Sequence, residues 1–217
     1  MHIEIYSDYV CPWCRIGKKN LFDALADWTA EHGIQPTLTY RAFLLDPSVP
    51  EQGSPFQDWI NRKMGGSAPS ERATAQVTQA AAAVGLTMQF DRISIYPSTR
   101  LAHRMIALTP LQQQTAAVDA LFKAYFEEGI DIGSIEHLMR IADGIGIEDT
   151  DELAAKLLLG DGEEDVAADL QRAERIGVTG VPFFVFDGKY ALSGAYPKVD
   201  FAALLSRLAF DPSAGER

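Results

Sequence analysis

The chain has 217 residues, of which 47% are hydrophobic and 23% are charged, and it contains two cysteines. This composition excludes an intrinsically disordered chain, and the length allows a sizeable core to form without disulfide cross-links. The 19 basic and 30 acidic side chains give a formal net charge of −11. Because this charge repels phosphate backbones and anionic lipid surfaces, we expect neither nucleic acid nor a membrane as a partner.

The N-terminal residues lack the features of a secretory signal, which are a basic segment, an apolar segment and a small-residue cleavage site. No later stretch approaches the apolar length of a membrane span. We therefore expect a cytoplasmic protein. In that reducing compartment a single close pair of cysteines is more often catalytic or metal-binding than structural. The sequence specifies no oligomeric state.

The first elements along the chain are predicted to be a strand, a helix and a second strand. Residues 3–6 are short and apolar enough for a strand. A helix is predicted from Pro12, a residue type suited to the first helical position, to a stop at Gly33. Residues 37–45 alternate as a strand does, and a parallel pair joined by the crossover helix is the natural packing.

Between residues 48 and 162 the strand signals nearly vanish. Successive helical patterns, separated by glycine or proline, cover residues 55–64, 70–84, 98–108, 112–126, 134–143 and 151–159. Another helix is predicted at 163–176. The strand signal returns at 183–186, and the Asp187-Gly188 turn predicts an antiparallel partner at 190–193 before a last helix at 198–208.

This order of elements predicts an α/β protein in which helices flank a central mixed β-sheet. A strand-helix-strand unit and a hairpin-helix unit bracket a long helical block. Residues 1–47 and 163–217 are therefore assigned to one discontinuous domain, and residues 48–162 to a large all-helical insertion domain.

The two cysteines, Cys11 and Cys14, lie where the first strand gives way to a helix. The free N–H groups and the dipole at a helix N-terminus stabilise a thiolate, so we expect Cys11 to be the nucleophile. Cys14 is one turn further on the same side, so the two sulfurs can reach disulfide distance. We expect the Cys14 sulfur to lie deeper and to act as the resolving thiol.

Half of a zinc site is the first alternative for this pair. Zinc usually takes four ligands, and the sequence has no other cysteine. Its four histidines contain no pair at the usual close spacing, and they are His2, His32, His103 and His137. We therefore expect no metal, with a metal shared between two chains and an inert buried pair as the alternatives left open.

A second site signal is Val181-Pro182, directly before the strand at 183–186. A proline there donates no hydrogen bond to the sheet. We predict a cis Val181–Pro182 peptide bond, which leaves the backbone of Val181 free to pair with a substrate segment and places the proline ring over the cysteines. The local sequence alone favours a trans proline at an edge strand, but the Cys-x-x-Cys motif reverses that preference.

Several stretches together carry a resemblance to a known family. They are Ser7-Asp8-Tyr9-Val10-Cys11-Pro12-Trp13-Cys14, Ala102-His103-Arg104, and Val181-Pro182-Phe183-Phe184-Val185-Phe186 with Ser193-Gly194-Ala195. They resemble the DsbA family of the thioredoxin superfamily, and in particular its FrnE-like cytoplasmic branch, over the chain to about Leu208. The resemblance implies a thioredoxin-like fold with a helical insertion, and thiol–disulfide oxidoreductase or isomerase activity on protein or peptide thiols and disulfides. It implies no cofactor beyond the Cys11–Cys14 disulfide, with glutathione as a candidate redox partner.

Two departures from the family pattern affect this expectation. Trp13 stands where the periplasmic oxidases of the family usually have histidine, so we expect a weaker oxidant. Ile5 replaces the buried acid that superfamily members often carry six residues before the first cysteine. Asp8 and Glu4 are nearby candidates for proton transfer to Cys14, although a solvated carboxylate is the expected interpretation of each.

Further candidate residues depend on how the predicted elements pack. His103 and Arg104 are expected to lie on a solvated or ion-paired helix face; if their helix overhangs Cys11, they bind substrate or tune the thiolate. Pro12 belongs to the active-site loop. Aromatic residues that could form an apolar rim around the cysteines are Tyr9, Trp13, Phe183 and Tyr196.

Two other functions compete with a thiol–disulfide oxidoreductase. Relatives of the same fold include glutathione-dependent isomerases and transferases of the 2-hydroxychromene-2-carboxylate isomerase and kappa types. Those relatives typically have serine in place of the first cysteine and lack the second, so retention of both Cys11 and Cys14 favours redox chemistry. The non-enzymatic alternative is a chaperone-like binding module in which the cysteines are incidental.

Overall fold

The computed structural model describes residues 1–209. Residues 210–217, which end the part of the discontinuous domain predicted at 163–217, lie outside the described residues. Its main sheet has the strand order β2-β1-β5-β6. The strands are β1 (His2–Ser7), β2 (Thr37–Ala42), β5 (Phe183–Phe186) and β6 (Tyr190–Ser193). β1 and β2 are parallel, whereas β5 is antiparallel to both of its neighbours. The predicted mixed sheet is therefore confirmed.

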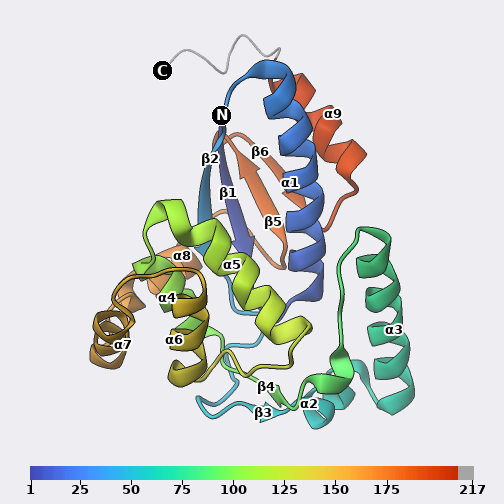
Figure 1. The fold of residues 1–217 in the computed structure, drawn as a ribbon. Coiled ribbons are helices and arrows are strands. Elements are labelled where there is room, and N and C mark those ends of the chain that lie inside the picture. The colour runs from blue at the N-terminus through green and yellow to red at the C-terminus, as the bar shows by residue number, and fades with distance from the viewer. Residues whose placement is uncertain (210–217) are drawn as a thin grey trace.

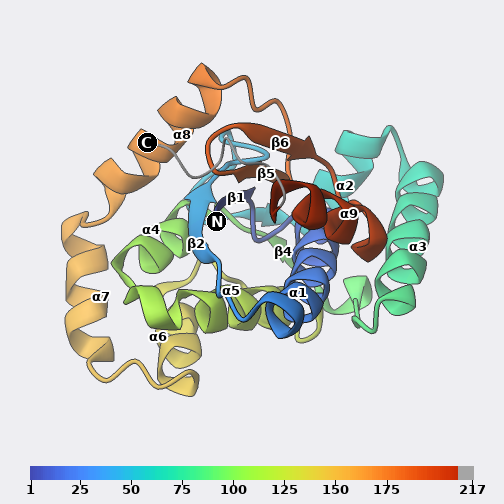
Figure 2. The ribbon, with the colours of Figure 1, turned by 90° about the horizontal axis from the view of Figure 1, so that it is seen from above.

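Helices make up most of the remaining described residues. They are α1 (Pro12–His32), α2 (Phe56–Met64), α3 (Ser67–Ala83), α4 (Arg100–Leu108), α5 (Leu111–Phe126), α6 (Ile135–Gly144), α7 (Thr150–Leu159), α8 (Glu163–Arg175) and α9 (Lys198–Ala209). Helices α2 and α3 lie on one side of the N-terminal end of α1, and α4 to α7 lie on the other side (Figure 1, Figure 2). No helix within residues 1–209 is long and apolar enough to cross a membrane.

The two faces of the main sheet are covered by different helices. Alternate residues of a strand point to opposite faces. Ile3 and Ile5 of β1 lie in a buried cluster with Phe201 of α9 and with residues of α1. Tyr6 points the other way and is buried with Ala173 of α8. β1 is thus covered on both faces, and its C-terminal end leads directly to the cysteines.

The helical segment, residues 48–162, also contains a pair of short antiparallel strands that the sequence did not predict. β3 (Ser54–Pro55) pairs with β4 (Ile95–Tyr96), and a 3-10 helix (Phe90–Arg92) precedes β4. Strands this short show no alternating pattern in the sequence. The segment is therefore mainly helical rather than all-helical, and the division of the chain at residues 47 and 163 stays a prediction.

β2 ends at Ala42 rather than at Leu45, where the alternating pattern ends. The N–H of Phe43 still donates to the carbonyl of Ser7, at 3.1 Å. The N–H of Leu45 instead donates to the Asp8 carboxylate, at 2.8 Å. Where the strand pattern continues past Ala42, the backbone therefore bonds to the Asp8 side chain from the turn after β1 and not to β1 itself.

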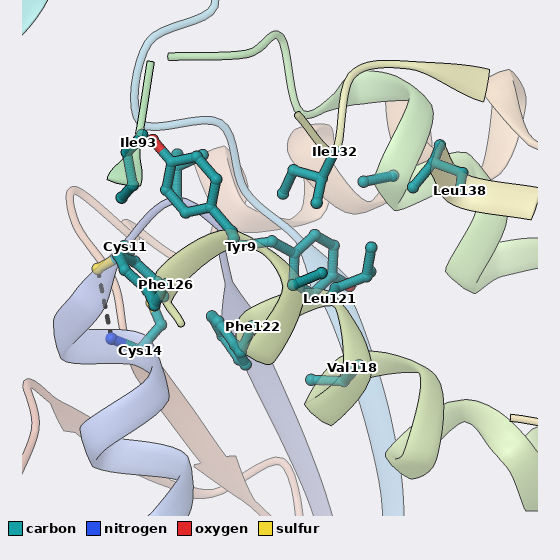
Figure 3. Packing of buried hydrophobic residues seen from close by; sticks show 14 of the residues in the cluster. Tyr9, Cys11, Cys14, Ile93, Val118, Leu121, Phe122, Phe126, Ile132 and Leu138 are labelled. Atoms are coloured by element: carbon teal, nitrogen blue, oxygen red, sulfur yellow. Dashed lines mark hydrogen bonds between the residues drawn. The ribbon is translucent and has the colours of Figure 1, made fainter. Parts of the chain in front are cut away.

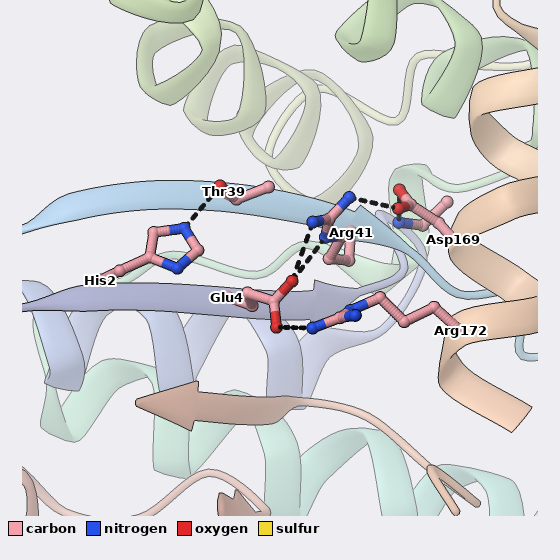
Figure 4. A network of polar contacts seen from close by, with 7 residues as sticks. His2, Glu4, Thr39, Arg41, Asp169 and Arg172 are labelled. Atoms are coloured by element: carbon pink, nitrogen blue, oxygen red, sulfur yellow. Dashed lines mark hydrogen bonds and ion pairs between the residues drawn. The ribbon is translucent and has the colours of Figure 1, made fainter. Parts of the chain in front are cut away.

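Glu4 of β1 is the centre of a buried polar network (Figure 4). Glu4 is only 3% exposed, and Arg41 and Arg172 each bind one of its carboxylate oxygens at 2.8 Å. Asp169 of α8 binds Arg41 at 2.8 Å and accepts the backbone N–H of Ala42 at 3.0 Å. The expectation of a solvated Glu4 is wrong, because α8 covers this face of the sheet. Burial acts to raise the pKa of Glu4, but hydrogen bonds from Arg172 and Arg41 outweigh it and hold this pKa below its usual value.

Glu4→Gln should lower the free energy of unfolding at pH 7 by about 2 kcal/mol. This is less than the roughly 3–5 kcal/mol typical of a broken, fully buried ion pair, because both arginines are partly exposed and can be solvated. A carboxylate whose pKa is lowered by folding stabilises the protein above its unfolded pKa. The difference from the wild type should therefore shrink as the pH falls below about 4.3, the usual glutamate pKa.

Urea denaturation at a series of pH values measures this difference. Glu31→Gln is the matched control, since Glu31 is an exposed residue of α1, and it should change stability by less than about 0.5 kcal/mol. An equal effect of the two substitutions at pH 7 would contradict a stabilising role for the Glu4 network.

Candidate active site

Cys11 is the N-cap residue of α1, and Pro12 occupies the first helical position. The backbone of Cys11 is extended, with φ −90° and ψ 109°, and turns the chain from β1 into the helix. The Cys11 N–H donates to the carbonyl of Asp8 at 3.0 Å, and the N–H of Cys14 donates to the Cys11 sulfur at 3.4 Å. The sulfur thus takes the place of the oxygen acceptor that usually caps a helix, and it faces the positive end of the helix dipole.

The Val181–Pro182 peptide bond is cis and lies beside this cap. The Cys11 thiol donates to the carbonyl of Val181, with sulfur and oxygen 3.6 Å apart. On the other side of the loop, a Cβ added to Gly17 of α1 would lie 2.9 Å from Cγ of Pro182. Only glycine at position 17 therefore lets α1 approach the proline ring this closely.

Cys14 is 1% exposed, deeper than Cys11 at 4%. Both belong to the buried cluster that contains Phe122 and Phe126 of α5 (Figure 3). Burial, and after it the neighbouring Cys11 sulfur, raise the pKa of the Cys14 thiol well above its usual value. A reduced Cys14 therefore keeps its proton at neutral pH, and its sulfur lies deeper than that of Cys11.

An apolar groove of about 330 Å³ opens beside Cys11. Residues from the turn, the cis-proline loop and the helical segment form its walls. The lining residues outside the helical segment are Val10, Cys11, Pro12, Trp13, Leu45 and Val181, and those within it are Phe56, Trp59, Ile60, Lys63, Met64, Ala73, Thr74, Gln76, Val77, Phe90, Tyr96, Tyr125 and Phe126. Trp59 and Tyr96 stack with ring centroids 3.4 Å apart. Lys63 is the only charged residue among these lining residues.

Sequence reasoning missed the wall that the helical segment provides. Its aromatic residues come from α2, α5, the 3-10 helix and β4, and no motif links them. Each one also fits an ordinary core position on its own helix or strand. Only the arrangement of these elements around α1 brings the residues to one side of Cys11.

Asp8, Tyr9 and His103 lie together behind the cysteines rather than on the surface. They are 1%, 2% and 3% exposed, and the rings of Tyr9 and His103 are 4.5 Å apart. The expectations of a solvated Asp8 and of a solvated helix face for His103 are wrong, because α4 packs against the turn after β1 and the loop after β2. The ion-paired alternative agrees with the distance of 3.6 Å between Nε2 of His103 and Oδ1 of Asp8. Tyr9 therefore belongs to the core and not to a rim.

The other candidates divide between the groove and distant positions. Trp13 is 37% exposed and lines the groove. Arg104 points to the end of α7, where its Nε donates to the carbonyl of Asp161 at 2.9 Å. Phe183 packs edge-on against Tyr6, with centroids 6.1 Å apart, on the α8 face of the sheet. Tyr196 is partly exposed but is not among the groove residues.

Comparison with known proteins places this geometry in a family. Residues 2–206 match the DSBA-like thioredoxin domain family. A probable DsbA oxidoreductase from Streptomyces coelicolor is 31% identical, with a TM-score of 0.86 over 100% of this chain and 91% of that one. These matches confirm the predicted thioredoxin-like fold and the resemblance to the DsbA family.

More distant structures share the fold alone. The cytosolic disulfide reductase DsbM from Pseudomonas aeruginosa, solved with GSH, is 17% identical, with a TM-score of 0.67 over 96% of this chain and 99% of that one. A 2-hydroxychromene-2-carboxylate isomerase is also 17% identical, with a TM-score of 0.71 over 100% of both chains.

Gly17→Ala tests the close approach of α1 to Pro182. The free energy of unfolding should fall by about 1 kcal/mol, because overpacking costs about 1–3 kcal/mol whereas replacing a helical glycine gains about 1 kcal/mol. Gly144→Ala is the control, since Gly144 ends α6 with open space around its Cβ position, and it should not lower stability. Urea denaturation followed by circular dichroism measures both. Equal effects would contradict tight packing at Gly17.

Proposed function

The chain belongs to the DSBA-like thioredoxin domain family of thiol–disulfide oxidoreductases, and from that premise we propose that it exchanges disulfides with protein or peptide clients through Cys11 and Cys14. The observation that carries the proposal is the position of the Cys11 sulfur. It caps α1, lines the apolar groove and lies 3.6 Å from the carbonyl of Val181, next to the cis proline. One sulfur thus meets a helix N-terminus, an apolar groove and the cis-proline loop.

In the first step, the Cys11 thiolate attacks one sulfur of a client disulfide. The client S–S bond breaks, a mixed disulfide forms between Cys11 and the client, and the other client sulfur leaves as a thiolate. The Cys14 N–H and the α1 dipole both face the attacking sulfur and stabilise its negative charge. In this proposal, the position of the Cys11 sulfur at the N-terminus of α1 is what activates it as a nucleophile.

In the second step, Cys14 resolves the mixed disulfide. Its sulfur bonds to the Cys11 sulfur, the bond from Cys11 to the client breaks, and the proton of the Cys14 thiol passes to the leaving client sulfur. Because burial raises the pKa of Cys14, this proton is held until the client is bound. The same steps in reverse oxidise a client dithiol, so the redox partner sets the direction of electron flow.

The groove supports a polypeptide client. Its walls suit apolar side chains next to a client cysteine, and in this proposal the backbone of Val181 pairs with an extended client segment. We propose glutathione as the redox partner, which the likeness to DsbM, solved with GSH, supports. A cytoplasmic location and membership of the FrnE-like branch are parts of the same proposal.

A glutathione-dependent isomerase is the second candidate, favoured by the likeness to 2-hydroxychromene-2-carboxylate isomerase. Such a reaction does not need a resolving thiol. The burial of Cys14 one turn behind Cys11 favours the redox function, because a second thiol at this position is what resolves a mixed disulfide. Replacing Cys14 separates the two candidates.

Cys14→Ser should trap client proteins on Cys11 as mixed disulfides, because the resolving thiol is missing. Non-reducing gels and mass spectrometry of the variant, incubated with a disulfide-bonded client such as oxidised ribonuclease A, measure the adducts. Cys11→Ser is the matched control and should trap none. Absence of adducts, together with glutathione-dependent isomerisation of a small aromatic substrate by the Cys14 variant, would contradict the redox proposal and favour the isomerase.

Trp13→His should shift the equilibrium with glutathione about tenfold toward the dithiol form, which corresponds to about 30 mV. The reason is that an imidazolium next to Cys11 stabilises the thiolate of the reduced protein. Leu158→His is the control, since Leu158 is exposed on α7, and it should leave the equilibrium unchanged. The measurement is the fraction of alkylated cysteines across glutathione buffers. An unchanged equilibrium in Trp13→His would contradict the idea that the side chain at position 13 controls the stability of the Cys11 thiolate.

A further inference from the structure

Two buried acids lie in and just after β1, and their surroundings differ. Both oxygens of Glu4 are held by arginines, as described above. Asp8 is 1% exposed, and only its Oδ2 atom accepts a hydrogen bond, from the N–H of Leu45 at 2.8 Å. Its Oδ1 atom is buried and has no hydrogen-bond partner among the described residues. The negative charge of Asp8 is therefore compensated much less than that of Glu4.

His103 is the basic group that faces this oxygen. Its Nε2 atom lies 3.6 Å from Oδ1 of Asp8 and 3.1 Å from the carbonyl of Phe43. A carbonyl can only accept a hydrogen bond, so Nε2 carries a hydrogen. Contact with the Tyr9 ring fixes the orientation of the imidazole. The Nε2–H group is thus held between a carbonyl and the uncompensated carboxylate oxygen.

The remaining titratable groups around Asp8 do not supply a positive charge. Tyr96 of β4 and Tyr125 of α5 are buried, and burial followed by the charge of Asp8 raises the pKa of each hydroxyl above its usual value. Both therefore stay neutral at physiological pH, as does Tyr9, whose pKa burial also raises. Among residues 1–209, His103 is the basic side chain that forms a contact of ion-pair distance with Asp8.

Asp8 is also coupled to the nucleophile through the backbone. Its carbonyl accepts the N–H of Cys11 at 3.0 Å, so a single hydrogen-bonded turn joins the two residues. The charges of Asp8 and Cys11 both act on the hydroxyl of Tyr96, so the two groups share one buried surrounding. Like charges repel more strongly away from water than in it. The Asp8 charge consequently disfavours the reduced form, and the N–H of His103 reduces that effect.

We infer that Asp8 and His103 are positioning residues that set the reduction potential of the Cys11–Cys14 pair through opposite effects on the Cys11 thiolate. The inference rests on the proposed function. The reaction measured is the exchange with glutathione. The Cys11 and Cys14 thiols lose two electrons and their protons and form an S–S bond, while the S–S bond of glutathione disulfide breaks and each of its sulfurs takes up an electron and a proton.

The test is the equilibrium constant of this exchange for Asp8→Asn, His103→Leu and His103→Gln. Asp8→Asn keeps the acceptor for Leu45 but removes the charge, so the equilibrium should move at least fivefold toward the dithiol. His103→Leu removes the N–H that faces Asp8, and the equilibrium should move at least threefold toward the disulfide. His103→Gln returns an N–H donor and should move the equilibrium back toward the wild-type value.

Glu4→Gln is the control for Asp8→Asn, because it also neutralises a buried acid of β1 but one already compensated by arginines; it should stay within twofold of the wild type. Shifts of Asp8→Asn and His103→Leu in the same direction overturn the inference, since loss of packing alone has no sign. If His103→Leu does not fold, an equilibrium of Asp8→Asn within twofold of the wild type overturns it as well. Wild-type protein that does not exchange with glutathione or any disulfide would instead contradict the proposed function.

Discussion

The hydrogen bond from the Cys14 N–H to the Cys11 sulfur ties the chemistry of this protein to the start of α1. A helix needs an acceptor at its N-cap, and here the sulfur of the proposed nucleophile is that acceptor. Moving the helix relative to β1 would therefore move the sulfur as well. The Cys11 contact with Val181 and the close approach of Gly17 to Pro182 hold the opposite side of the same junction.

The helical segment completes this junction in two ways. Its α4 helix brings His103 behind the turn, where it meets Asp8, and its aromatic residues build a groove in front of Cys11. The turn follows directly after β1, and the buried Glu4 network joins β1 to β2 and α8. The cysteines thus lie between a rigid sheet and a helical wall, with one side open to the groove.

Local signals in the sequence located most of the helices and strands of the described residues. The Asp187-Gly188 turn placed the hairpin strands at the residues where they occur, and Pro12 marked the start of α1. The surroundings of Asp8, Glu4 and His103 could not be read in this way. Their partners come from distant parts of the chain; Arg172, for example, is 168 positions from Glu4. Asp8, Glu4 and His103 are buried because another element of the fold covers them, and no local pattern in the sequence indicates that cover.

The groove has one wall from inside the helical segment and one from outside it, and this has an evolutionary consequence. Cys11 and the cis-proline loop lie before and after the helical segment in the sequence, whereas Trp59, Phe90 and Phe126 lie within it. Substitutions in α2 or α5 can therefore reshape the groove without altering the Cys11 and Cys14 sulfurs. Under the proposed function, a change of client therefore does not require a change at either cysteine.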